Sequence, residues 1–240
     1  MVLLVFGILS TVVMITMTNT LGIANQTSAT YTGVNQVLNL STTLESLVRS
    51  EVEPGPPSAT TPPVPVPGFA VNGENTNSLT FFSDVGSLYG PAQIVAAESS
   101  VANSCTGKCP IPTYSFTVTE TLPTANTCPG TGTQQRGSGC VYAAANAKRV
   151  VGINNVANTS STPIFTYTIL MGGVPLIITP AQLTSGFFST CNSSGCHSDT
   201  IQSVAISLSI AVQGAPNTAA YNTTAYRLSS ASYQYSSTVG

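Results

Sequence analysis

The chain is short of charged residues. Only 6% of its 240 residues are Asp, Glu, Lys or Arg, and none of them precedes Glu45; an ordinary soluble domain has about 25%. Six basic residues scattered along a chain of net charge −2 form no basic footprint, so no nucleic-acid partner is expected. Ser, Thr, Asn and Gly take the place of charge, which is unlike the surface of a cytosolic protein.

The sequence also lacks the common catalytic motifs. It has one histidine, His197, and no Gly-x-Ser-x-Gly elbow, glycine-rich phosphate loop, His-Glu-x-x-His or EF-hand pattern. A hydrolase would have to join His197 to a serine and to Asp84 or Asp199. A histidine directly after Cys196, however, is more often an exposed loop residue. We therefore expect no enzyme activity, no cofactor and no metal.

Six cysteines lie in three close pairs. An even number of cysteines in a chain with an exported composition favours disulfide bonds. The spacings Cys-x3-Cys and Cys-x4-Cys beside a single histidine do not match the usual zinc sites. Pairing of nearest neighbours is the simplest connectivity. It joins Cys105 to Cys109, Cys128 to Cys140, and Cys191 to Cys196.

What the chain does have is a long apolar start. No charge occurs from Val2 to Ala24, and Val, Leu, Ile, Phe and Met dominate as far as Met17. About 20 such residues in a helix span the hydrocarbon core of a membrane. A cleaved signal peptide would have a basic flank, which is missing, and a small-residue cleavage site, of which residues 22–24 are a mediocre version. A buried core helix is the third interpretation. We expect residues 2–24 to be a membrane anchor.

Beyond the anchor, apolar residues recur at spacings of three, four and seven. This period predicts an amphipathic continuation over residues 25–53, ended by Pro54. Residues 1–53 would then form one N-terminal helix. Residues 42–45, Thr-Thr-Leu-Glu, could instead be a capping box that starts a new helix. Glycines within the helix are weak points where it could bend.

The composition changes after this helix. Residues 54–68 are rich in proline and predict a linker or a long surface loop. Residues 69–240 contain short β-branched and aromatic runs separated by Gly, Pro, Asn and Ser, which predict a mainly antiparallel sheet domain. The fold class is therefore α+β. One strand is predicted with a single buried face formed by Val204, Ile206, Leu208, Ile210 and Val212.

Several asparagines match the Asn-x-Ser/Thr pattern for glycosylation. In a chain so rich in these residues, chance produces several matches. If the source organism glycosylates exported proteins, the last three of the matches are expected to be surface sites. The five matches are Asn25, Asn39, Asn158, Asn192 and Asn222.

Further patterns lie outside the cysteine-bearing middle of the chain. Residues 44–51, Leu-Glu-Ser-Leu-Val-Arg-Ser-Glu, end the predicted helix, and residues 77–84, Asn-Ser-Leu-Thr-Phe-Phe-Ser-Asp, begin the sheet. Residues 203–212 and 223–228 form the last pair of strands. With the long apolar start, these segments resemble the type IV pilins. The likeness is greatest to minor pilins and pseudopilins of the larger W or J type.

This resemblance implies a single-pass membrane protein with its head outside the cell. It also implies a structural subunit of a type IV pilus-like fibre or of a type II secretion pseudopilus, with pilus assembly machinery and other pilins as partners. In such proteins the helix is held by membrane lipid and then packs against neighbouring helices in the extracellular fibre. The assembly face that the resemblance implies consists of Val34, Val37, Leu38, Leu44, Leu47 and Val48.

The pilin cleavage motif, a Gly followed by Phe, Thr, Leu, x and Glu, is absent, so no prepilin-peptidase residue is assigned. Because the first residues are similar to the helix segment that comes directly after that motif in pilins, we hypothesise that the true start lies upstream. A membrane-anchored adhesin or binding module that does not assemble is the alternative function. An exported enzyme that depends on His197 is a third.

Overall fold

The computed structural model describes a long N-terminal helix and strands of the domain formed by residues 69–240, which we call the head. All six cysteines, His197 and the proline-rich segment 54–68 lie outside the described residues, so the predictions for them stay predictions. The described residues are 2–51, 69–70, 76–85, 90–103, 112–124, 141–159, 161–171, 174–179, 181–182, 201–211 and 218–226.

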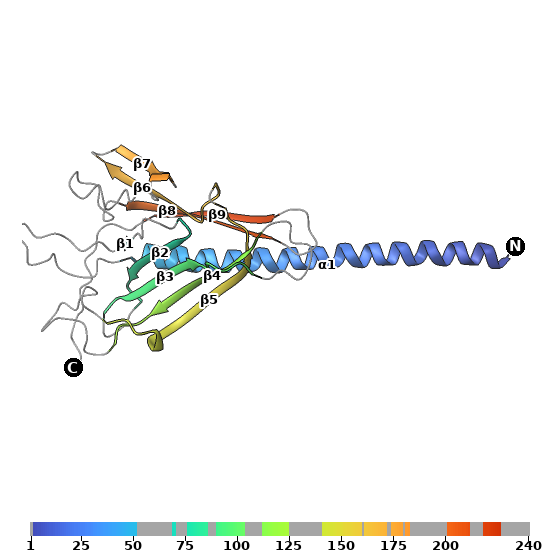
Figure 1. Cartoon of the computed structure of the whole chain (residues 1–240), viewed down its shortest axis with the longest axis horizontal. Coiled ribbons are helices and arrows are strands. Elements are labelled where there is room, and N and C mark those ends of the chain that lie inside the picture. Colours follow the sequence, from blue (N-terminus) through green and yellow to red (C-terminus); the bar gives the residue numbers. More distant parts are fainter. Residues whose placement is uncertain are drawn as a thin grey trace, which may run out of the picture.

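Helix α1 is continuous from Val2 to Arg49. Its 48 residues correspond to a rod about 72 Å long, and Figure 1 shows that its N-terminal half projects beyond the sheet. The predicted capping box does not start a new helix. The hydroxyls of Thr42 and Thr43 instead donate to the carbonyls of Leu38 and Asn39, one turn back, at 2.9 and 2.8 Å.

The strands of the described residues form one sheet in which every paired neighbour is antiparallel. With the long helix, this confirms the α+β class. A short 3-10 turn, η1 (Ala144–Asn146), precedes β5. The strands are β1 (Phe69–Ala70), β2 (Ser78–Ser83), β3 (Ala92–Glu98), β4 (Tyr114–Thr121), β5 (Ala147–Val156), β6 (Phe165–Met171), β7 (Val174–Ile178), β8 (Ile201–Ala211) and β9 (Thr218–Tyr226).

Strand β8 connects the two parts of this sheet. The order is β1-β2-β3-β4-β5-β8-β6-β7, with β9 also paired to β8. The first part of β8 pairs with β6, and Ile210 near its end pairs with Val156 of β5. Strand β8 also forms a hairpin with β9, from Ser203 opposite Tyr226 to Ala211 opposite Thr218. Both parts of the sheet contact α1, the first through β2 and β5 and the second through β8 and β9.

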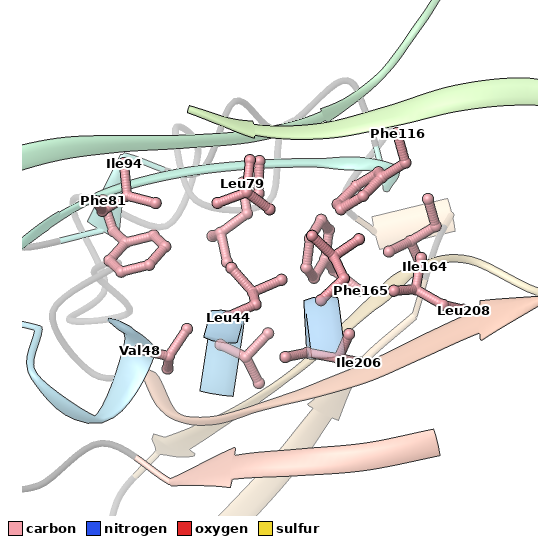
Figure 2. Packing of buried hydrophobic residues seen from close by; sticks show 14 of the residues in the cluster. Leu44, Val48, Leu79, Phe81, Ile94, Phe116, Ile164, Phe165, Ile206 and Leu208 are labelled. Atoms are coloured by element: carbon pink, nitrogen blue, oxygen red, sulfur yellow. The ribbon is translucent and has the colours of Figure 1, made fainter. Parts of the chain in front are cut away.

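The core lies around the C-terminal half of α1. A stripe formed by Val37, Leu40, Leu44 and Val48 is buried, at the spacing of three and four that places residues on one helix face. In Figure 2, Leu44 and Val48 lie between Leu79 and Phe81 on one side and Ile206 on the other. The predicted inward face of β8 is buried as well, namely Val204, Ile206, Leu208 and Ile210; Val212 lies outside the described residues.

The end of α1 is fastened to the end of β2. The last carbonyls of a helix have no partner within the helix. Here the Ser83 hydroxyl donates to the carbonyl of Leu47 at 3.1 Å, and the Asp84 amide donates to the carbonyl of Ser50 at 2.9 Å. Ser50 and Ser83 are also joined through their hydroxyls at 2.7 Å. These bonds fix the direction in which the helix leaves the head.

Of the glycines in α1, Gly33 has a packing role. It is buried, and a Cβ at this position would overlap the Cδ1 of Ile210 on β8. A Cβ at Gly22 would meet nothing within 4 Å. The first glycine thus allows β8 to approach the helix closely, and neither glycine breaks the helix.

Replacing Leu44 by alanine is expected to destabilise the head. Leu44 is fully buried, and removing such a side chain from a core costs about 2–5 kcal/mol. Leu38→Ala is the matched control, because Leu38 lies on the same helix and is 37% exposed. The measurement is the free energy of unfolding by denaturant in mild detergent. Equal losses for the two variants would contradict this placement of the core.

Candidate membrane anchor and assembly surface

The N-terminal half of α1 is bare, meaning that no other described part of the chain covers it. Every side chain from Phe6 to Ala29 is exposed. Within the described residues this is the one helix long and apolar enough to cross a membrane, and none of its most apolar window is buried in the fold. The interpretation of the apolar start as a buried core helix is therefore wrong. An apolar surface of this size that no described part of the chain covers is suited to lipid or to other helices.

Threonine hydroxyls in this segment are satisfied inside the helix. In lipid no water is present to bond a polar group, so an unpaired hydroxyl would be costly. Each threonine donates to the carbonyl four residues earlier, a bond that threonine makes readily in helices. The pairs are Thr11 to Gly7, Thr16 to Val12 at 2.6 Å, Thr18 to Met14 at 2.9 Å and Thr20 to Thr16 at 2.8 Å. These four hydroxyls are compatible with a hydrocarbon environment.

Between the bare helix and the head lies a polar cleft of about 400 Å³. Its walls come from α1 and from the ends of β5 and β8, and no charged residue lines it among those that the structure describes. Asn155 on its wall has φ of 62°, a left-handed conformation that asparagine tolerates better than most residues. The polar lining consists of Asn25, Ser28, Thr32, Gln36, Asn154 and Asn155.

The six residues predicted as an assembly face divide into two groups. Val37, Leu44 and Val48 are buried against the chain's own sheet, and Leu47 packs partly buried on the same core. Val37, Leu44 and Val48 are covered by the chain's own sheet and so are not available to a neighbouring helix, whereas the assembly role of Leu47 stays a prediction. Val34 and Leu38 are 38% and 37% exposed.

Tyr31 belongs with the exposed pair. It precedes Val34 by three residues and Leu38 by seven, so the three side chains share one face of α1, and Tyr31 is 68% exposed. We name Tyr31, Val34 and Leu38 the outer strip. Sequence reasoning missed Tyr31 because the surrounding residues are polar. The signal that could have revealed it is its own helical spacing to Val34 and Leu38.

Within the described residues no group of three or more His, Cys, Asp or Glu side chains gathers that could hold a metal ion. Asp84 follows β2, and its backbone amide donates to the carbonyl of Ser50 at the end of α1. His197 and Asp199 lie outside the described residues. Glu120 is buried and pairs with Lys148 at 3.5 Å. The hydrolase hypothesis therefore stays a prediction that the described part of the chain does not support.

Glu98 and Asn77 form a polar joint between β3 and the start of β6. The Asn77 amide donates to Glu98 Oε2 at 2.6 Å, and the backbone amide of Ile164 donates to Asn77 Oδ1 at 3.2 Å. Glu98 Oε1 is buried with no hydrogen-bond partner among the described residues. Burial raises the pKa of Glu98, and the bond from Asn77 partly opposes this rise.

Asn158 is not a surface acceptor for a glycan, contrary to the sequence expectation. It is 4% exposed. Its amide Nδ2, the atom that would carry the sugar, donates to the carbonyls of Thr162 and Ser207 at 2.9 and 2.8 Å, and its Oδ1 accepts from the Ser209 amide at 2.9 Å. Asn25 and Asn39 are exposed on α1. The side chains of Asn192 and Asn222 lie outside the described part of the chain.

Comparisons with family models, with curated proteins and with solved structures gave no match to this chain. The functional argument therefore rests on features of the chain itself. They are a long apolar N-terminal helix, bare over its first half, and an antiparallel sheet packed on its second half.

Glu98→Gln is expected to change how stability depends on pH. The pKa of Glu98 is raised in the fold above its ordinary 4.5. At pH values between the unfolded and the folded pKa, the folded chain therefore binds more protons than the unfolded chain, and its stability falls as the pH rises through this range. Glutamine keeps an acceptor for Asn77 and cannot ionise. Unfolding measured between pH ~4 and ~7 should therefore show the wild type losing stability relative to the variant; parallel curves would contradict this.

Proposed function

We propose that this chain is a structural subunit, most similar to a minor pilin or pseudopilin, of a type IV pilus-like fibre or a type II secretion-like pseudopilus. The observation that carries the proposal is the division of α1. Its first half is apolar and bare, and its second half is the central element of the head's core. A subunit that is stored in a membrane and later drawn into a fibre requires such an arrangement.

In the stored state the helix lies in lipid. Its backbone groups are bonded within the helix, and its threonine hydroxyls are bonded to preceding carbonyls. The head lies outside the membrane on the cell surface, and the bonds between Ser83, Asp84 and the helix end hold it at a fixed angle to the anchor. The polar residues 25–32 then form the passage from lipid to head.

In the assembled state the same apolar surface packs against other helices. Removal of apolar surface from water stabilises by about 25 cal/mol per Å², so a bundle of such helices holds without covalent links. The outer strip of Tyr31, Val34 and Leu38 extends this surface past the membrane segment to the side of the head. The hydrogen bonds from Ser83 and Asp84 tie the end of the helix to the head.

A second candidate is a membrane-anchored adhesin or binding module that stays single. The uncharged polar cleft beside residues 25–36 favours it, since amides and hydroxyls in a concavity suit a neutral polar ligand. The two candidates differ in one property. A fibre subunit needs its outer strip for contact with other subunits, and an anchored module does not.

Membrane retention is expected to depend on the apolar half of α1. Val13→Arg combined with Met17→Arg places two charges on exposed positions near the middle of the anchor, and each arginine costs about 2.5–3.5 kcal/mol at a membrane centre. The double variant should leave the membrane fraction in an alkaline wash. Val13→Leu with Met17→Leu is the control and should be retained. Retention of the arginine variant would contradict the anchor.

Fibre assembly is expected to fail when the outer strip is charged. Val34→Asp with Leu38→Asp should abolish fibres sheared from the cell surface, because carboxylates in a helix bundle would be desolvated without partners. The head should stay folded, since both side chains are exposed. Asn35→Asp adds a charge at the exposed position next to Val34 and serves as control. Unchanged fibres in the double variant would favour the anchored binding module.

A further inference from the structure

The projecting half of α1 carries an exposed seam of regularly spaced residues. Alternating steps of four and three connect Ile8, Val12, Ile15, Asn19 and Gly22, which is the spacing of the contact positions in a coiled coil. We name these five residues the anchor seam. All five are exposed along the part of α1 that projects beyond the sheet in Figure 1.

The Asn19 side chain differs from the threonines next to it on α1. The threonines around it donate to carbonyls of their own helix, whereas the Asn19 side chain has no hydrogen bond to any part of the chain that the structure describes. It lies about 9 Å from the middle of the span 2–24, within the ~15 Å half-thickness of the hydrocarbon core. An amide left unpaired there is costly.

A second copy of the same helix is the partner that satisfies this amide. Copies inserted by the same route are parallel, so their Asn19 residues lie at the same depth. A primary amide is both donor and acceptor and therefore pairs with its own kind. Asparagine at a contact position fixes the register of parallel helices. Gly22, one turn further on, has open space around it and allows close approach.

We propose that copies of this chain associate in the membrane through the anchor seam, with Asn19 hydrogen-bonded to Asn19 of the neighbouring copy. The contact is parallel and in register, with Ile8, Val12 and Ile15 packed on the same side. This inference rests on the proposed membrane anchoring and adds to it the partner and the residue that sets the register.

The test uses the full chain in phosphatidylcholine vesicles, labelled at its C-terminus with a donor or an acceptor dye. Energy transfer is followed as the ratio of protein to lipid is varied, and unlabelled chain is added to show that the transfer is specific. Asn19→Ala should weaken association by about 3- to 30-fold, the range for loss of one hydrogen bond between membrane helices. Asn19→Gln, which keeps the amide, should restore most of it.

Thr20→Ala is the matched control. Thr20 lies at the same depth, and its hydroxyl donates to the carbonyl of Thr16 in its own helix at 2.8 Å, so association should be unchanged. Equal association of wild type and Asn19→Ala, or a wild type that is bound to vesicles but does not associate, would overturn the seam. A wild-type chain that stays out of the vesicles would overturn the anchor as well, so the two failures are distinguishable.

Discussion

Burial of one face of α1 against the sheet is the contact on which the rest of the structure depends. Leu40 and Leu44 are completely covered, and strands from both parts of the sheet contact the helix. Among the described strands β8 joins β5 to β6, and both parts of the sheet that meet there contact α1. The same contact makes the projecting half of the helix a rigid extension of the head. The projecting helix and the head are thus one mechanical unit built on a single helix.

The sequence predicted the strands that have their own signal and missed those that do not. Alternation of apolar and polar residues predicted β8, and the segments 77–84 and 223–228 predicted β2 and part of β9. Strand β3 is rich in alanine, and β5 carries Lys148, Arg149 and two adjacent asparagines. These two strands form because β3 pairs with β2 and β4, and β5 pairs with β4, rather than from local preference.

The candidate site was predicted in part for a related reason. Helical spacing shows that one face of α1 is buried, but it does not show what buries it. Val37 and Val48 were therefore predicted to contact neighbouring helices, although they are buried within the chain itself. Asn158 is a similar case. The glycosylation pattern Asn-x-Ser/Thr predicted that it is exposed, but its side chain is hydrogen-bonded to the backbone of Ser207 and Ser209, far along the chain. Long-range partners decide both cases.

The long stretch of chain between α1 and β8 has a consequence for folding. The stripe of α1 is synthesised well before β8 and β9, the strands that pack on the helix. Pairing of such distant segments is slow, because a long loop must close before the contact is gained. During synthesis the apolar stripe stays uncovered until β8 and β9 have been made. Packing of the β8–β9 hairpin then covers the stripe, while the N-terminal half of α1 keeps its exposed apolar side chains.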